Sequence, residues 1–304
     1  MSCSLGSVWG IWRPSPAAHL LYASPVTDPV LVPMDADDTR AVQVDILCYI
    51  DDFCARANLR YFLWAGTLLG SVRHGGFIPW DDDIDLAMPR PDYEEFIRRF
   101  AVTDTGYYRL FSRDTHETYG YPFARVADDR TQIAERARLA VRMGVSVDVF
   151  PIDGWPRGSA QTRLHRIRMD LLHRAVSVWR SRPREGARRR LKNLAIRAAR
   201  PFLDRVPVRL LTGAITSAAR SIDYSRSQHV GVTAFRYVER VPRDAYGTPR
   251  DIEFEGRTFR AGPQESAVIL TRLYGDYMTP PPASARTHRH FHSAYRLVQP
   301  PSIT

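Results

Sequence analysis

Aspartates and apolar residues alternate between residues 81 and 88, which is the clearest periodic pattern in the chain. Successive side chains of an extended strand point to opposite faces, so a period of two predicts a strand that is buried on one face. The apolar face is expected to carry Ile84, Leu86 and Met88, and the acidic face Asp81, Asp83 and Asp85. Burial of the apolar face would hold three carboxylates in one row.

Four other segments have patterns that predict regular structure. Tyr61–Ala65 is a short apolar run, typical of a buried strand, and Val145–Val149 alternates so that Asp148 stands on the polar face of a second strand. Apolar residues at helical spacing predict helices over Asp37–Ala57, which has an acidic start, and over Arg90–Phe100, which has a proline at its beginning.

The acidic face has the donor atoms of a metal site. Three like charges repel one another unless a cation neutralises them, and carboxylates without histidine or cysteine favour Mg²⁺ or Mn²⁺. Spacing excludes a calcium loop: counted from Asp81, its required glycine falls on Leu86 and its required glutamate on Asp92. Mg²⁺ usually completes its shell with water and substrate phosphates, so a phosphorylated substrate is indicated. A solvated acidic surface is the alternative without a ligand.

A glycine-rich segment before the aspartates is a candidate phosphate site. A strand that enters a helix through Gly66 and Thr67 exposes backbone amides, which suit a phosphate. The candidate phosphate-binding residues are Gly66, Thr67, Gly70, Ser71 and His74. Arg73 is a candidate to stabilise charge on a transferred group, because its planar guanidinium matches phosphate oxygens. An ordinary helix start would use the same glycine and threonine.

Basic residues exceed acidic residues by 43 to 33, giving a net charge of +10. They recur from Arg163 to Arg200, where the first helical stretch also carries an apolar stripe of Leu164, Ile167, Leu171, Leu172, Ala175, Val178 and Trp179. Such a helix suits an anionic membrane surface, and a helix packed on its own domain with a solvated arginine face suits the pattern equally. We expect no nucleic-acid partner, because no recognition motif accompanies the charge.

The cysteine count and the absence of a long apolar run predict a cytoplasmic protein, with the inner face of the membrane as a candidate location. The odd number of cysteines, three, argues against a disulfide framework. No apolar run reaches the ~18 to 20 residues of a membrane span, and no secretory signal is recognisable. The histidines at 288, 290 and 292 lack the spacing of a metal site and are interpreted as surface residues.

The string GTLLGSVRHGGFIPWDDDIDLAMPR, residues 66–90, resembles the signature of the LicD family, whose relatives include fukutin and fukutin-related proteins. That family is similar in fold to the nucleotidyltransferases typified by DNA polymerase beta, which combine a Gly-Ser or Gly-Thr turn, an Asp-x-Asp strand and a third carboxylate. Gly66 and Thr67 match the turn, Asp83 and Asp85 the Asp-x-Asp pair, and Asp148 the third carboxylate. The resemblance covers residues 40–156 and 250–295.

The resemblance implies an α/β (α+β) fold, with a nucleotidyltransferase-like mixed sheet, flanking helices and a basic helical insertion. We expect a loose N-terminal extension over residues 1–35 and a catalytic core over 36–156. A basic, mostly helical insertion is expected over 157–249. Residues 250–304 are expected to form a hairpin and a closing segment, in which Tyr274, Gly275 and Asp276 match a family motif and Asp276 is a further candidate site residue.

The function that the resemblance implies is transfer of a phosphoryl-alcohol group, such as phosphocholine, from a CDP-alcohol to a sugar hydroxyl of a glycan or a lipid-linked precursor. Asp83, Asp85 and Asp148 would hold Mg²⁺ or Mn²⁺, and Asp148 could instead accept the proton of the acceptor. Two alternatives stay open: a nucleotidyltransferase that leaves a nucleoside monophosphate on its acceptor, and a membrane-associated glycan-assembly partner without catalytic activity.

Overall fold

A mixed seven-stranded sheet forms the centre of the protein. The computed structural model describes residues 29–134, 142–180, 200–201, 205–235, 239–286 and 293–298. The strand order is β2 (Phe62–Leu63), β3 (Asp85–Pro89), β7 (Ser146–Gly154), β5 (Ala124–Asp128) and β4 (Tyr108–Phe111), with β8 (His229–Val232) paired to β7 and β9 (Val241–Pro242) paired to β8. β3 and β7 are parallel and the other pairs are antiparallel. The expected α/β fold with a mixed sheet is confirmed.

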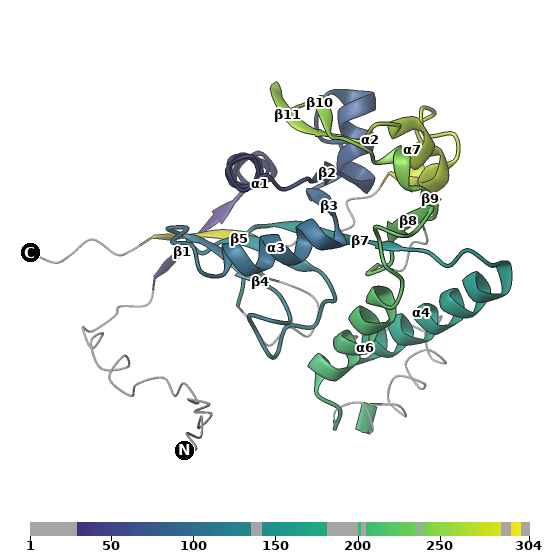
Figure 1. The fold of residues 1–304 in the computed structure, drawn as a ribbon. Helices are drawn as coiled ribbons and strands as arrows, with labels where there is room; N and C mark the ends of the chain where they lie inside the picture. The colour runs from purple at the N-terminus through teal and green to yellow at the C-terminus, as the bar shows by residue number, and fades with distance from the viewer. Residues whose placement is uncertain are drawn as a thin grey trace, which may run out of the picture.

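Helices α1 (Ala36–Ala57) and α3 (Arg90–Phe100) lie against the strands of this sheet (Figure 1), and aromatic side chains join the two helices. Asp35 caps α1 by accepting a hydrogen bond from the Asp38 amide at 2.8 Å. The ring centroids of Phe53 on α1 and Phe96 on α3 lie 5.6 Å apart. Both helices follow the ranges expected from their apolar spacing, because that spacing gives each of them one face that must be buried.

The C-terminal hairpin packs on α2 (Ala65–His74) at the upper end of the molecule in Figure 1. It consists of β10 (Arg250–Phe254) and β11 (Arg257–Gly262), and α7 (Ser266–Tyr274) follows, with Gly275 as its C-cap. Ser71 on α2 donates its hydroxyl to the Glu253 carbonyl at 2.6 Å. The 3₁₀ turns η3 (Arg243–Ala245) and η4 (Ala283–Ala285) flank this region. The expected hairpin is confirmed.

Two helices of the basic segment form a small core of their own. α4 (Ser159–Arg180) packs on α6 (Val208–Arg220) through Met169, Val176, Ile215, Ala218 and Ala219. The helical part ends before residue 229, because the short apolar strand β8 pairs with β7 of the main sheet. The expected insertion boundary at residue 249 is therefore wrong. In the part of the chain that the structure describes, no helix is long and apolar enough to cross a membrane.

A second, three-stranded sheet joins segments that are distant in the sequence. Its order is β1 (Val30–Met34), β12 (Ala294–Val298) and β6 (Thr131–Ile133), with both pairs antiparallel. The expected loose extension over residues 1–35 thus ends at least five residues earlier, because the apolar segment Val30–Met34 has a partner strand that no local pattern reveals.

Candidate active site

Asp81, Asp82 and Asp83 lie in a loop, and β3 begins only at Asp85. The expectation that the aspartate ladder is a strand from residue 81 is therefore wrong for its first four residues. The Asp81 amide donates to the Ile78 carbonyl at 2.8 Å, which makes a turn. Two side chains of α1 then bind the loop backbone in place of a neighbouring strand: Arg40 donates to the Asp81 carbonyl at 2.8 Å and Gln43 to the Asp82 carbonyl at 3.0 Å.

This loop brings the three carboxylates together. One oxygen from each of Asp81, Asp82 and Asp83 lies within 4.8 Å of the others, and all three residues are half-buried. Asp82 belongs to the cluster although strict alternation would place it on the opposite face. Closely spaced carboxylate oxygens are the donor set of a hard divalent cation, and partial burial makes their mutual repulsion stronger than in water. These residues fit the expected Mg²⁺ or Mn²⁺.

Asp85 and Asp148 stand side by side on the parallel strands β3 and β7, as register partners. Asp148 is in turn the register partner of Arg125 on β5. The three residues form a row across adjacent strands, and Arg125 Nε lies 2.8 Å from Asp148 Oδ1. Arg125 also lies over the ring of Tyr121, at 4.2 Å from its centroid. The guanidinium of Arg125 balances the charge of Asp148, one of two neighbouring carboxylates. It also fixes the orientation of the Asp148 side chain.

The start of α2 holds Asp85 through its backbone. The Asp85 amide donates to Thr67 Oγ1 at 2.8 Å, and the Asp85 carbonyl accepts from the Trp64 amide at 2.9 Å. Thr67 is buried, so its hydroxyl serves this contact. A Cβ at Gly66 would lie 2.4 Å from Asp81 Oδ2. Glycine therefore leaves room for the Asp81 carboxylate in this position beside the helix start, a reason for the glycine additional to phosphate binding.

The buried carboxylate of Glu239 holds the side chain of Trp64, the residue directly before α2. Glu239 accepts hydrogen bonds from Trp64 Nε1 at 2.6 Å and from the Tyr246 hydroxyl at 2.5 Å, and it is fully buried. Burial raises the pKa of Glu239 to about 7, although both hydrogen bonds and Arg272 act in the opposite direction. Trp64 is followed by Ala65 with φ of 46°, a left-handed conformation that is strained for a residue with a Cβ.

The other candidate phosphate residues lie further along α2. Gly70 permits close packing of the return loop, since a Cβ there would lie 2.3 Å from the Gly76 carbonyl oxygen, and the Ser71 hydroxyl is bound to β10. Arg73 is seven residues beyond Gly66, or about 10 Å along the helix axis, and it donates to the Tyr277 carbonyl at 2.8 Å. The structure thus brings Gly66 and Thr67 to the aspartates and gives Gly70 and Ser71 packing contacts.

Arg73 and His74 belong to a separate basic group at the far end of α2. Arg73 Nε lies 3.5 Å from His74 Nδ1, and Arg286 lies over the ring of Trp80 at 5.0 Å. Burial, followed by the nearby Arg286, lowers the pKa of Arg73, and burial together with Arg73 lowers the pKa of His74. Both effects favour the neutral form of the His74 imidazole.

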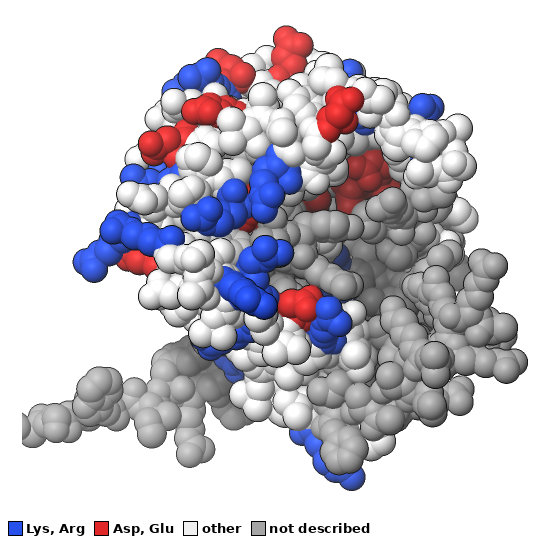
Figure 2. Space-filling view, turned by 90° about the vertical axis from the view of Figure 1, so that its right-hand side faces the viewer, with Lys and Arg blue, Asp and Glu red and all other residues white. Residues whose placement is uncertain are grey.

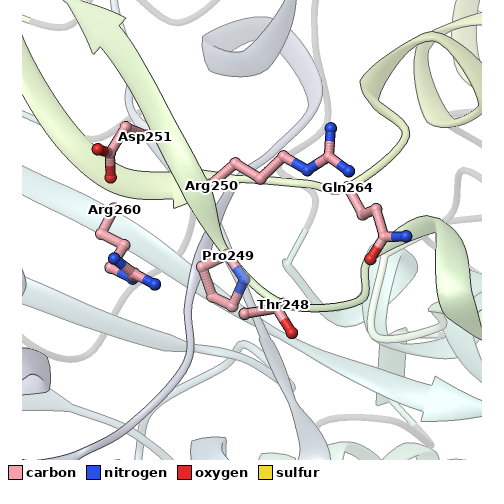
Figure 3. A pocket seen from close by; sticks show the side chains of 6 residues that line it. All are labelled: Thr248, Pro249, Arg250, Asp251, Arg260 and Gln264. Carbon is pink, nitrogen blue, oxygen red and sulfur yellow. The ribbon is translucent and has the colours of Figure 1, made fainter.

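A pocket of about 420 Å³ lies beside the hairpin and is separate from the aspartates. Its lining consists of Thr248, Pro249, Arg250, Asp251, Arg260 and Gln264. In Figure 3, Arg250 extends toward Gln264, whereas Asp251 and Arg260 lie on the other side of the strand. No member of the carboxylate cluster lines this pocket, so the loop at Asp81–Asp83 and the row at Asp85 define the candidate active site.

Sequence reasoning missed Arg125 and Glu239. Arg125 lies between small or apolar residues, Ala124 and Val126, and a charged residue at such a position was a signal that could have been used. Nothing local distinguishes Glu239. Asp276 follows the C-cap of α7 in an exposed loop. The histidines at 288, 290 and 292 lie outside the described residues, as does most of the second basic helical stretch up to Arg200.

Comparison with known proteins finds a family match over the part of the chain that carries these residues. Residues 58–153 match the family described as LicD/FKTN/FKRP, nucleotidyltransferase domain. The chain is 29% identical over 269 residues to lipopolysaccharide cholinephosphotransferase LicD of Haemophilus influenzae, which is 86% of this chain and 97% of that protein. It is 48% identical over 40 residues to the ribitol 5-phosphate transferase FKRP of Homo sapiens, covering 13% of this chain and 8% of that protein.

Proposed function

Because the chain carries a LicD-family nucleotidyltransferase domain, we propose that it is a transferase that moves a phosphoryl-alcohol group from a CDP-alcohol to a sugar hydroxyl. The acceptor would be a glycan or a lipid-linked precursor. The observation that carries the proposal is the row of Asp85, Asp148 and Arg125 beside the carboxylate cluster at Asp81–Asp83. The related proteins are named as a cholinephosphotransferase and a ribitol 5-phosphate transferase. The cholinephosphotransferase is the one that aligns with most of this chain, so phosphocholine is the first group to test.

Asp83, Asp85 and Asp148 would hold Mg²⁺ or Mn²⁺, with Asp81 and Asp82 as further oxygen donors. When bound, such a cation supplies charge neutralisation of the donor diphosphate. The chain's own residues orient the reacting groups: Thr67 and Trp64 fix the backbone of Asp85, and Arg125 fixes the carboxylate of Asp148. Gly66 and the amides that open α2 would bind a phosphate oxygen.

In the proposed reaction the acceptor hydroxyl oxygen forms a bond to the alcohol-bearing phosphorus. The bond from that phosphorus to the bridging oxygen breaks, and its electron pair leaves with CMP. In the alternative in which Asp148 does not bind the cation, the hydroxyl proton passes to one of its carboxylate oxygens, which lie next to Asp85 in the row. Arg125 compensates the negative charge that Asp148 carries before this transfer.

The experiment is an assay of CMP release and acceptor mass, with purified protein, Mg²⁺, a panel of CDP-alcohols and extracted glycan acceptors. CMP release from one donor, absent in Asp83→Asn, with an acceptor gain equal to that alcohol phosphate, is the expected result. Full turnover by a folded Asp83→Asn variant would contradict the metal role.

A nucleotidyltransferase reaction is the second candidate, since the matched domain carries that description. The same carboxylates would serve it, but the acceptor would gain a nucleoside monophosphate. The acceptor mass therefore separates the two reactions in the same experiment.

A further inference from the structure

Helix α4 has two apolar faces, and only one of them is packed. Met169 and Val176 face α6 and are buried. Three large aliphatic side chains lie on another face and are exposed: Leu164 by 68%, Ile167 by 49% and Leu171 by 61%. The spacing of three and four residues aligns them along one line of the helix, which we call the α4 stripe. The other members of the stripe predicted from the sequence are half-buried, namely Leu172, Ala175, Val178 and Trp179, and the buried Met169 and Val176 were not part of that prediction.

Arginines border the α4 stripe on both sides. Helical spacing places Arg163 and Arg174 next to Ile167, and Arg168 on the other side, next to Leu164. Arg174 is ion-paired with Asp170 at 2.7 Å, whereas Arg163 and Arg168 have no ion pair among the described residues. Figure 2 shows the side of the molecule on which α4 lies, and blue side chains predominate over red ones across its middle and lower part.

We propose that the α4 stripe seats the protein on the surface of an anionic lipid bilayer. An interfacial helix places aliphatic side chains at the level of the acyl boundary and arginines at the headgroups, which is the arrangement found here. The helix would lie on the surface rather than span it, consistent with its polar remainder. This proposal goes beyond the transfer reaction, and membrane binding can be measured without turnover.

The charge pattern favours lipid over a second copy of the chain. A symmetric dimer through this face would bring identical arginine borders together, and like charges in an interface oppose association. Cys48 and Cys54 are unpaired, which suits a reducing compartment, and the anionic surface that faces such a compartment is the cytoplasmic leaflet.

The test is flotation of the full-length protein with vesicles of phosphatidylcholine alone or mixed with phosphatidylglycerol. We expect binding to the mixed vesicles only. In the Leu164→Gln/Leu171→Gln variant the partition coefficient should fall roughly tenfold or more, because two apolar anchors are lost. Arg163→Gln/Arg168→Gln should weaken binding by a similar factor, since each arginine near an anionic surface contributes about fivefold, and added salt should mimic this effect.

The matched control is Val102→Gln/Val268→Gln, which replaces exposed apolar residues outside α4 (82% and 37% exposed) and should bind like the wild type. Circular dichroism and light scattering check that each variant keeps the fold and the oligomeric state. Failure of the wild type to bind mixed vesicles would overturn the proposal. So would undiminished binding by the stripe variant, or a wild-type dimer that becomes monomeric in the stripe variant.

Discussion

Arg125 and Asp148 are register partners on neighbouring antiparallel strands, and the guanidinium Nε lies 2.8 Å from the carboxylate Oδ1. Asp85 stands on the other side of Asp148. The arginine therefore compensates part of the negative charge of two adjacent carboxylates. Replacement of Arg125 can therefore change the orientation of the Asp148 carboxylate without removing Asp85 or Asp148.

Replacement of Arg125 by glutamine should lower kcat about 10- to 100-fold, the usual effect of losing a residue that orients a metal-binding carboxylate. The assay is CMP release under saturating donor, together with circular dichroism. The matched control is Arg220→Gln on α6, whose exposed ion pair with Glu94 joins two helices and involves no residue of the row. Equal kcat in the two variants would show that Arg125 does not orient Asp148 for catalysis.

Gly66→Ala should impair metal binding and turnover while the protein stays folded. The added Cβ would lie 2.4 Å from Asp81 Oδ2, so the carboxylate must move. Gly213→Ala within α6 is the control, because its Cβ would meet no atom closer than 3.8 Å and alanine favours the helix. We expect the affinity for Mn²⁺, measured by titration calorimetry, to fall in the first variant and to be unchanged in the second.

Removal of carboxylates from the loop should weaken cation binding directly. In Asp81→Asn and Asp83→Asn we expect the dissociation constant for Mn²⁺ to rise about tenfold or more, because each change removes a charged ligand. Mn²⁺ should also raise the thermal midpoint of the wild type and have little effect on these variants. Asp251→Asn, in the separate pocket, should behave like the wild type. Equal midpoint shifts in all four proteins would argue against a cation site at this loop.

Because the pKa of Glu239 is raised by burial, we expect the free energy of unfolding to depend on pH. This pKa is raised from 4.5 to about 7 in the folded protein, so the folded state binds the proton more tightly than the unfolded state. The stability associated with this proton is fully present below pH 4.5 and is lost as the pH rises through about 7. The loss amounts to about 3 kcal/mol.

Glu239→Gln should remove this dependence, because glutamine can accept from Trp64 and donate to the Tyr246 oxygen without ionising. Urea unfolding at pH 5 and pH 8 provides the measurement. We expect the free energy of unfolding of the variant, relative to the wild type, to be greater at pH 8 than at pH 5. A constant difference between the two proteins would mean that Glu239 does not titrate in this range.

The sequence predicted the parts of the fold that depend on local spacing. The helices Asp37–Ala57 and Arg90–Phe100 and the hairpin after residue 250 follow their patterns closely, because each buries one face defined by its own periodicity. It failed at the start of the aspartate segment, where Arg40 and Gln43 on α1 hold the backbone in a loop. Such contacts join residues about forty positions apart, and no local pattern reports them.

The residues of the candidate site also divide into those that a local pattern predicts and those that depend on long-range contacts. Gly66, Asp83 and Asp148 were identifiable because one short motif and one alternating strand carry them, and the structure places Asp148 next to Asp85. Arg125 required knowledge of which strand pairs with β7, and Glu239 required the tertiary position of Trp64. Both are set by long-range packing, which is why the residues that orient the acids were missed.

The small sheet of β1, β12 and β6 constrains the order of events during synthesis. Its central strand, β12, is the last of the three to leave the ribosome, and residues 134–293 separate it from β6. Until β12 emerges, β1 and β6 have no partner in this sheet, and their unpaired edges stay accessible to other chains. The main sheet does not need β12, so all of its strands are available before the small sheet can close.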